Sequence, residues 1–223
     1  MVTPRRIELD SWPRRSWFDH YFHQSPCTYA VTAELDVTGL EQQIKLAGAR
    51  TYPAQVWAVS NVINRHDEFR MTLTEAGGPA VWPHVHPAFT TFHTSTETFS
   101  SLWVPYVDDF SAFQHTMAAA IEHYQGAYEL FPQPDVPENV FDISAIPWAS
   151  FTGFTLDIQG GYQHLAPIIT LGRRVHRDGR SSLPIAVQVH HATADGFHVA
   201  RLINEIQELF DSPDWLAPPS GRQ

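Results

Sequence analysis

The stretch that decides the fold is Val187-Gln-Val-His-His-Ala-Thr-Ala-Asp-Gly-Phe-His198. It begins as a strand, and Asp195 then opens a helix, because aspartate is a preferred N-cap residue. The pair His190-His191 lies on the turn between these elements. Backbone on both sides holds such a histidine, which suits a positioned general base. On chemistry alone, a helix N-cap preceded by two ordinary polar residues explains the stretch equally well.

The spacing of apolar residues predicts three helices. The first covers about 53–65 and begins with a proline, which is favoured at the first helical position. The second covers 112–124 and is opened by a capping box of Ser111 and Gln114. The third follows Asp195 and has a strongly apolar face. That face consists of Val199, Leu202, Ile203, Ile206 and Phe210.

Strand patterns lie between these helices. Residues 29–37 alternate between apolar and mostly polar or small side chains, and 148–158 is predicted as a long strand. Two further strands cover 165–171 and 183–190, with a hairpin turn around Asp178-Gly179 between them. The strands outnumber the helices and do not alternate strictly with them. We therefore predict an α/β (α+β) fold, a two-layer sandwich with a mixed β-sheet covered by helices.

The composition is that of a globular, acidic protein. The chain has 223 residues, 43% of them hydrophobic, with 14 Lys+Arg against 24 Asp+Glu and a net charge of -10. This charge argues against non-specific binding to nucleic acid or anionic membranes. The single Cys27 excludes an intramolecular disulfide and a CxxC site. We expect one domain over 1–211 followed by a proline-rich C-terminal tail over 212–223.

No apolar run approaches the length of about 18 residues that a transmembrane helix needs. The first residues show no signal peptide, because no apolar segment follows the early arginines. The sequence therefore predicts a soluble, cytoplasmic protein.

The run from His190 to His198 resembles the HHxxxDGFH signature of chloramphenicol acetyltransferases, within the wider HxxxDG acyltransferase group. Further stretches match in the family's order and near its spacing, from about residue 7 to 211. They are Trp12-Pro-Arg14-Arg15, Pro26-Cys27, Tyr52-Pro53, Glu68-Phe69-Arg70-Met71, Thr96-Glu97-Thr98-Phe99-Ser100-Ser101-Leu102, Phe131-Pro132, Ser144-Ala-Ile-Pro-Trp148 and Ala166-Pro-Ile-Ile-Thr170.

This resemblance implies a CoA-dependent acyltransferase fold and a homotrimer, with the sheet extended between subunits and the active sites at the subunit interfaces. It implies acetyl transfer from acetyl-CoA, as co-substrate, to the primary (3-) hydroxyl of chloramphenicol, which confers antibiotic resistance. Transfer is direct, within a ternary complex. No permanently bound cofactor and no metal are expected.

The resemblance also assigns the catalytic roles. His191 is the general base, oriented through its own backbone carbonyl so that Nε2 stays unprotonated. Ser144 donates to the tetrahedral oxyanion, and Thr170 holds a water near it. Asp195 forms an ion pair with Arg14, a clamp that is architectural and transfers no proton. Without the resemblance, Ser144 and Thr170 are ordinary strand residues.

The resemblance places an apolar pocket for the acceptor around nine side chains. They are His20, Tyr21, Cys27, Phe99, Phe131, Asp142, Phe154, Leu156 and Ile168. As isolated residues, the aromatic and aliphatic members are more typical of a core. Two depart from the family pattern, because His20 stands where we expect phenylalanine and Asp142 where asparagine is common.

Four residues are candidates for contact with CoA, namely Arg50, Tyr52, Arg173 and Arg174. Arginine suits phosphate recognition, and Arg174 stands where the family has an aromatic residue against the adenine. The arginine-rich stretch 173–180 is equally typical of a solvated hairpin.

Three other interpretations remain. An HxxxDG acyltransferase with a different hydroxyl acceptor is signalled by His20 and Asp142. A non-catalytic protein that binds an aromatic ligand would need neither His191 nor Ser144. The pair His84 and His86 has a spacing compatible with zinc, but no third ligand is evident nearby.

Overall fold

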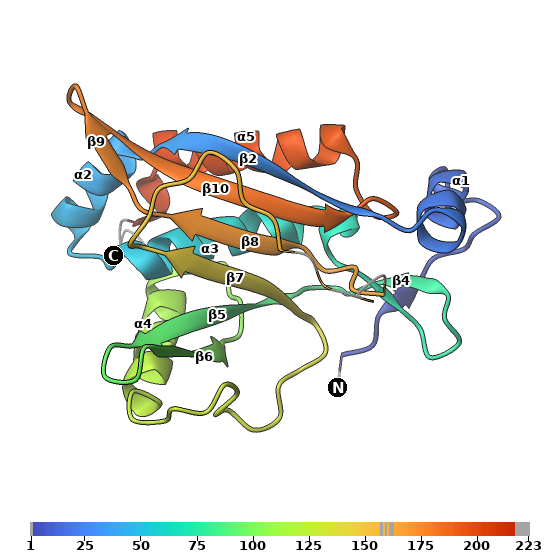
Figure 1. Cartoon of the computed structure of the whole chain (residues 1–223), viewed down its shortest axis with the longest axis horizontal. Coiled ribbons are helices and arrows are strands. Elements are labelled where there is room, and N and C mark those ends of the chain that lie inside the picture. The colour runs from blue at the N-terminus through green and yellow to red at the C-terminus, as the bar shows by residue number, and fades with distance from the viewer. Residues whose placement is uncertain (1, 157, 159, 161–162, 217–223) are drawn as a thin grey trace, which may run out of the picture.

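The computed structural model describes residues 2–156, 158, 160 and 163–216. Its main sheet has seven strands in the order β2-β10-β8-β7-β5-β6, with β9 pairing β10 (Figure 1). The strands are β2 Thr28–Asp36, β5 His86–His93, β6 Thr98–Trp103, β7 Val140–Ile146, β8 Ile168–Gly172, β9 Val175–Arg177 and β10 Arg180–His190. β7 pairs in parallel with β5 and β8, whereas the other pairs are antiparallel. The predicted mixed sheet is confirmed.

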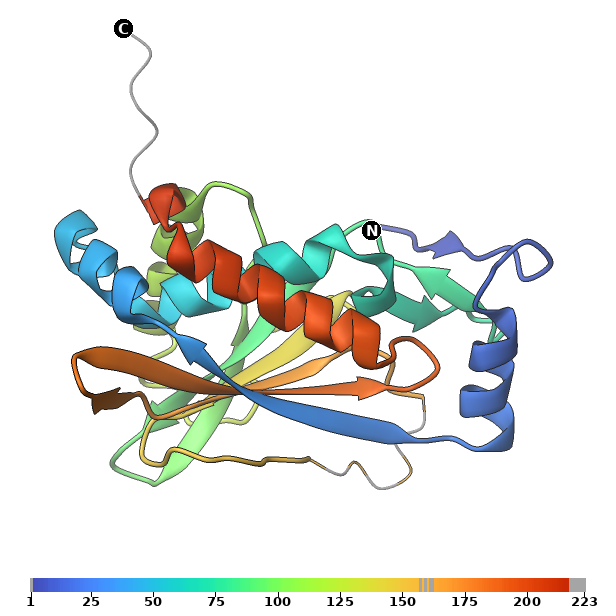
Figure 2. The same ribbon diagram turned by 90° about the horizontal axis from the view of Figure 1, so that it is seen from above.

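The four longer helices lie on one side of this sheet (Figure 2). They are α2 Thr38–Ala47, α3 Thr51–Arg65, α4 Phe110–His123 and α5 Gly196–Asp211. Short helical turns are α1 Arg15–Phe18, the π-helix η1 Asp19–Gln24, and the 3-10 helices η2 Asp67–Phe69 and η3 Asp214–Leu216. A small sheet of β1 Arg5–Arg6, β4 Pro79–Val81 and β3 Met71–Leu73 lies at one end. The arrangement is the two-layer architecture that the sequence predicts.

A row of buried apolar side chains explains this layering. Phe89, Ile143, Ile169 and Val187 are direct neighbours across four strands, so they share one face of the sheet. All four are at most 1% exposed and pack in the same core as α3 and α5. Burying side chains of this size stabilises the fold by about 1.5–3 kcal/mol each.

On the opposite face of the sheet, the central strands carry small and mostly polar side chains. Ser144, Thr170, Ala186 and Thr32 are neighbours in register across β7, β8, β10 and β2. Because side chains alternate along a strand, this row points away from the helices. The face that carries candidate catalytic groups is therefore separate from the face that forms the core.

The predicted strand over 148–158 is wrong. Residues 149–156 form no strand and cross the polar face of the sheet instead (Figures 1 and 2). Arg173 donates its N–H to Ala149 O at 2.8 Å, which fixes the start of this segment. Phe151 lies on Gly172, where a Cβ would stand 2.8 Å from the ring. The alternation therefore does not mark a buried face, since Trp148 and Leu156 are exposed and Phe151, which makes this contact, is not part of it; Asp157 and Gln159 lie outside the described residues.

The other local predictions have mixed outcomes. The helix over 53–65 is confirmed and begins at Thr51, and the turn at Asp178-Gly179 is confirmed by two positive φ angles, 51° and 77°. The capping box of Ser111 is wrong, because Asp109 caps α4 by accepting from Ala112 N. Gln114 accepts instead from the backbone N–H of Arg50 at 2.7 Å. Helix α2 and strands β5 to β7 were not predicted as elements.

The chain packs beyond residue 211. Trp215, in the predicted tail, stacks on Trp57 with ring centroids 4.5 Å apart and donates Nε1–H to Leu209 O. Leu216 is 6% exposed. Residues 213–216 are therefore part of the core packing, and 217–223 lie outside the described residues.

We expect Trp215→Ala to destabilise the fold by about 2–4 kcal/mol, because it removes a stacked indole and leaves a cavity beside Trp57. Denaturant unfolding followed by circular dichroism measures this. Trp17→Ala is the matched control, since Trp17 is 51% exposed. Equal losses for the two variants would contradict the packing role of Trp215.

Candidate active site

His191 follows directly on the last residue of β10. Its backbone N–H donates to Cys27 O at 3.0 Å, which continues the pairing with the segment before β2. Its ring stacks on Tyr21 with centroids 3.8 Å apart and planes 11° apart, and Tyr29 approaches edge-on at 5.1 Å. Nδ1 is buried and has no hydrogen-bond partner among the described residues. Ring stacking is therefore the contact that orients this imidazole.

His190 has a different environment from its neighbour. It is 1% exposed, and its Nδ1 accepts from Ala192 N at 3.1 Å. Its carbonyl accepts from both the backbone and the hydroxyl of Thr193. These contacts shape the turn, so His190 is structural and His191 is the histidine that reacts with a ligand if either does.

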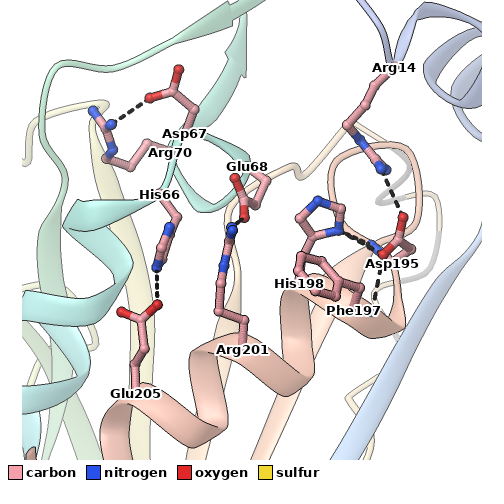
Figure 3. Close-up of polar contacts among 10 residues, drawn as sticks. All are labelled: Arg14, His66, Asp67, Glu68, Arg70, Asp195, Phe197, His198, Arg201 and Glu205. Atoms are coloured by element: carbon pink, nitrogen blue, oxygen red, sulfur yellow. Dashed lines mark hydrogen bonds and ion pairs between the residues drawn. The ribbon is translucent and has the colours of Figure 1, made fainter.

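Asp195 has a hydrogen-bond donor on each carboxylate oxygen (Figure 3). Arg14 Nη1 donates to Oδ2 at 2.8 Å, while Phe197 N donates to Oδ1 at 3.1 Å. His198 Nδ1 lies 2.8 Å from Oδ1 and accepts from the backbone N–H of Asp195 at 3.2 Å, so the two residues form a capping box. The ion pair with Arg14 that the resemblance implies is present. With its oxygens engaged in this way, the carboxylate is suited to hold the turn rather than to accept a proton.

The environment of Asp195 favours its ionised form. Burial alone raises the pKa of this carboxyl, but the hydrogen bond from Arg14 and the charge of His198 outweigh burial and lower it below the ordinary value. Further ion pairs follow along α5, where Arg201 pairs with Glu68 and Glu205 lies 2.8 Å from His66 Nε2 (Figure 3). The helix that begins at Asp195 is thereby tied to the turn around η2.

Ser144 and Thr170 lie side by side on β7 and β8. They are direct register partners, and Ser144 Oγ is 3.2 Å from Thr170 Oγ1. Thr170 is buried at 2% exposure, whereas Ser144 is partly exposed. A hydroxyl pair of this kind leaves one O–H free, since Thr170 can donate to Ser144 while Ser144 donates elsewhere.

A single chain does not bring His191 to Ser144. Thr170 pairs with Ala186 on β10, and five residues separate Ala186 from His191. At about 3.3 Å per strand residue, this places His191 roughly 16 Å farther along the sheet. The candidate base and the candidate oxyanion donor thus lie at different places on one subunit.

Comparison with known proteins bears on what this arrangement does. The sequence model of the chloramphenicol acetyltransferase family matches residues 3–207. A chloramphenicol acetyltransferase from Streptomyces acrimycini is 55% identical over 96% of this chain and 97% of its own length. One from Clostridium perfringens is 42% identical over 93% of this chain and 98% of its own.

The chain belongs to the chloramphenicol acetyltransferase family. The family resemblance and the enzyme class, an acyltransferase, are confirmed. A solved chloramphenicol acetyltransferase superposes with a TM-score of 0.82 at 22% identity, covering 93% of this chain and 100% of that one. A dihydrolipoamide acetyltransferase from Azotobacter vinelandii superposes with a TM-score of 0.67 at 16% identity, covering 97% and 93%. At these identities the two structures show the fold alone.

In this family member, seven of the nine predicted acceptor residues fall into two groups. The first surrounds His191: Tyr21 stacks on its ring, His20 contacts Tyr21 at 4.8 Å, and the carbonyl of Cys27 accepts from the His191 backbone. The second lies on or beside the strands around Ser144. Its members are Phe99 on β6, Asp142 on β7, Ile168 on β8 and Phe131 beside β6.

Phe154 and Leu156 belong to the segment that crosses the sheet. Phe99, Phe131 and Leu156 are all about half exposed or more, at 50%, 65% and 46%. Phe99 and Phe131 lie on and beside β6, whereas Leu156 is bonded to Gln188 on β10. These exposed apolar side chains are available to a ligand or to a second copy of the chain.

Asp142 has a partner that the sequence analysis missed. His164 Nε2 lies 3.5 Å from Asp142 Oδ2. Burial raises the pKa of Asp142, and the nearby His164 opposes this shift. The departure from asparagine at this position is therefore accompanied by a second titratable group. No local sequence pattern links His164 to Asp142, because the two residues lie far apart in the chain.

The four candidates for CoA contact differ in availability. Arg50 and Arg173 have exposed side chains. Tyr52 packs edge-on against Phe89, with centroids 6.2 Å apart. The guanidinium of Arg174 pairs with Glu41 on α2, although the side chain remains 46% exposed.

The histidine pair near β5 has another use than binding zinc. His86 Nδ1 accepts from Tyr106 N at 3.0 Å, and burial, with a contribution from His84, lowers the pKa of His86 to about 4. Among the described residues, no three metal-ligating side chains gather around a common point. None of the helices in the described part of the chain has the length and apolarity to cross a membrane.

We expect Asp195→Asn to destabilise the protein by about 1–2 kcal/mol at pH 7, because the charge-assisted bond to Arg14 is lost. The folded-state pKa of Asp195 is lowered, so its contribution is present above about pH 4 and is lost as the pH falls further. The difference between wild type and variant should therefore shrink towards pH 3 in denaturant titrations. Asp10→Asn is the control, since that carboxylate is 98% exposed. A difference that persists undiminished at pH 3 rules out the ionised clamp.

Proposed function

We propose that this chain transfers the acetyl group of acetyl-CoA to the primary (3-) hydroxyl of chloramphenicol and so confers resistance to the antibiotic. The observation that carries the proposal is the environment of His191, an imidazole at a strand end that stacks on Tyr21, on a turn that the Asp195–Arg14 ion pair fixes. It occupies the signature position of a family whose relatives are named for this activity. Acetyl-CoA acts as co-substrate, and no permanently bound cofactor is involved.

The chemistry follows from the side chains present. Nε2 of His191 takes the proton of the acceptor hydroxyl while that oxygen attacks the thioester carbonyl. The hydroxyl of Ser144 donates to the tetrahedral oxyanion, and Thr170 orients the serine and a nearby water. When the C–S bond breaks, the proton on Nε2 passes to the departing sulfur. Transfer is direct, and no acetyl-enzyme forms.

The separation of His191 from Ser144 supports a site completed by a second subunit. A homotrimer with cyclic symmetry places the His191 edge of one copy against the Ser144 face of the next. This assembly matches the two groups of acceptor residues, one near each catalytic side chain. The proposed location is the cytoplasm, as for the soluble protein that the sequence predicts.

A second candidate is an acyltransferase of the same group with a different hydroxyl acceptor. The Asp142–His164 pair favours it, because two titratable groups make that part of the pocket more polar than an amide would. A non-catalytic protein that binds an aromatic ligand is disfavoured, since binding alone needs neither His191 nor Ser144.

The test of the reaction follows thiol release from acetyl-CoA with and without chloramphenicol. We expect His191→Ala to lower kcat by about 10²–10⁴-fold and Ser144→Ala by about 10²–10³-fold, with KM little changed. His115→Ala, at an exposed position on α4, is the control. Full activity in folded His191→Ala would contradict the proposed mechanism. Thiol release that is independent of chloramphenicol would contradict the acceptor assignment.

The shared site is tested by mixing two inactive variants. His191→Ala and Ser144→Ala subunits, unfolded together and refolded at equal amounts, should regain about a quarter of wild-type activity. The reason is that half of the interfaces receive an intact His191 and half of those an intact Ser144. The same variants refolded separately are the control. No regain in the mixture would mean that both groups act within one chain.

A further inference from the structure

Two segments outside the sheet carry predicted acceptor residues, and each is fastened by a glutamine. The first runs beside β6, the outer strand of the sheet. Ser101 N donates to Leu130 O at 2.7 Å, and Trp103 N donates to Gln133 Oε1 at 2.5 Å. Gln133 Nε2 in turn donates to Trp103 O at 3.1 Å. One side-chain amide thus makes both hydrogen bonds that a neighbouring strand residue would make.

Phe131 lies between these two anchors. Leu130 precedes it and Gln133 follows two residues later, so its backbone is held on both sides. Its side chain is nevertheless 65% exposed. Ser100 adds a buried contact, since its hydroxyl donates to Glu129 O at 2.7 Å. A large apolar ring is therefore presented to solvent from a fixed backbone.

The second segment is the one that crosses the polar face of the sheet. Leu156 N donates to Gln188 Oε1 at 2.7 Å, and Gln188 Nε2 donates to Leu156 O. Gln188 stands on β10, three residues before His191, and is 7% exposed. Phe154 N donates to Thr32 Oγ1 at 3.3 Å. Leu156, like Phe131, is exposed although its backbone is doubly bonded.

We propose that Gln133 and Gln188 are positioning residues for the acceptor subsite. Each uses its amide to hold, through two hydrogen bonds, a non-sheet segment that presents an apolar side chain, Phe131 or Leu156. Neither glutamine touches a reacting atom, so each acts through the residue that it positions. The proposal rests on the proposed function, because the presented side chains are assigned to chloramphenicol there.

The chain contains a matched control for a purely stabilising role. Gln207 on α5 makes the same pair of bonds with Asp36, at 2.9 Å to the backbone N–H and 2.9 Å to the carbonyl, and its Nε2 also donates to Asp211 Oδ1 at 2.7 Å. No predicted acceptor residue is part of that contact. We therefore expect loss of the Gln207 contact to lower stability, as loss of the Gln133 or Gln188 contact does. Unlike those losses, it should leave substrate binding unchanged.

The experiment compares Gln133→Met, Gln188→Met and Gln207→Met, which keep side-chain length and remove both hydrogen bonds. Steady-state kinetics with chloramphenicol and acetyl-CoA give both KM values and kcat, and calorimetry gives Tm. We expect the first two variants to raise KM for chloramphenicol about five- to tenfold with kcat and KM for acetyl-CoA unchanged, because uniform binding is lost. Gln207→Met should lower Tm and leave both KM values unchanged. Chloramphenicol KM unchanged in all three variants overturns the proposal.

A double-mutant cycle tests whether Gln133 acts through Phe131. Phe131→Ala should raise KM for chloramphenicol, and adding Gln133→Met should then have no further effect. Additive effects would overturn the positioning role, and this holds even if Gln188→Met fails to fold. The proposed function fails separately, when wild-type protein shows no chloramphenicol-dependent thiol release. An active wild type with additive variants contradicts the inference alone.

Discussion

The carboxylate of Asp195 fixes the start of α5 and with it the turn that follows His191. It caps α5 through Phe197, bonds His198 and holds Arg14 from the N-terminal segment. These three contacts fix the turn between β10 and α5. A strand end alone would leave the imidazole free to move, since β10 stops at His190. The clamp and the stacking of Tyr21 together supply the preorganisation that the proposed proton transfer requires.

One face of the sheet forms the core that stabilises the fold, and the other face carries the candidate catalytic residues. The face under the helices holds the continuous apolar core, while the other carries Ser144, Thr170 and the exposed apolar residues. Substitutions on the second face can change the ligand with little effect on the core. The same division leaves His191 and Ser144 too far apart within one chain, which makes assembly part of the proposed catalytic design.

The elements that sequence predicted well are those specified by local rules. The apolar stripe of α5 and the Asp195 cap need only neighbouring residues. Local rules do not reveal contacts between distant residues: Gln114 bonds Arg50 instead of capping α4, and Arg174 pairs with Glu41, 133 residues earlier. The alternation of 148–158 predicts a strand, but Leu156 is exposed and the segment is held by hydrogen bonds to Thr32 and Gln188, which lie far from it in sequence. The candidate site itself was identified by the resemblance to a known family. The spacing of its residues alone did not identify it.

Gly172 lies where the crossing segment touches the sheet, and a Cβ there would come within 2.6 Å of Pro184 Cγ as well as close to Phe151. Glycine is therefore required at this position because there is no space for a Cβ atom. For protein engineers, this sets a boundary on useful mutagenesis. Libraries that seek new acceptors can vary the presented ends of the segment, whereas any side chain at residue 172 would collide with Phe151 and Pro184 and displace the start of the segment.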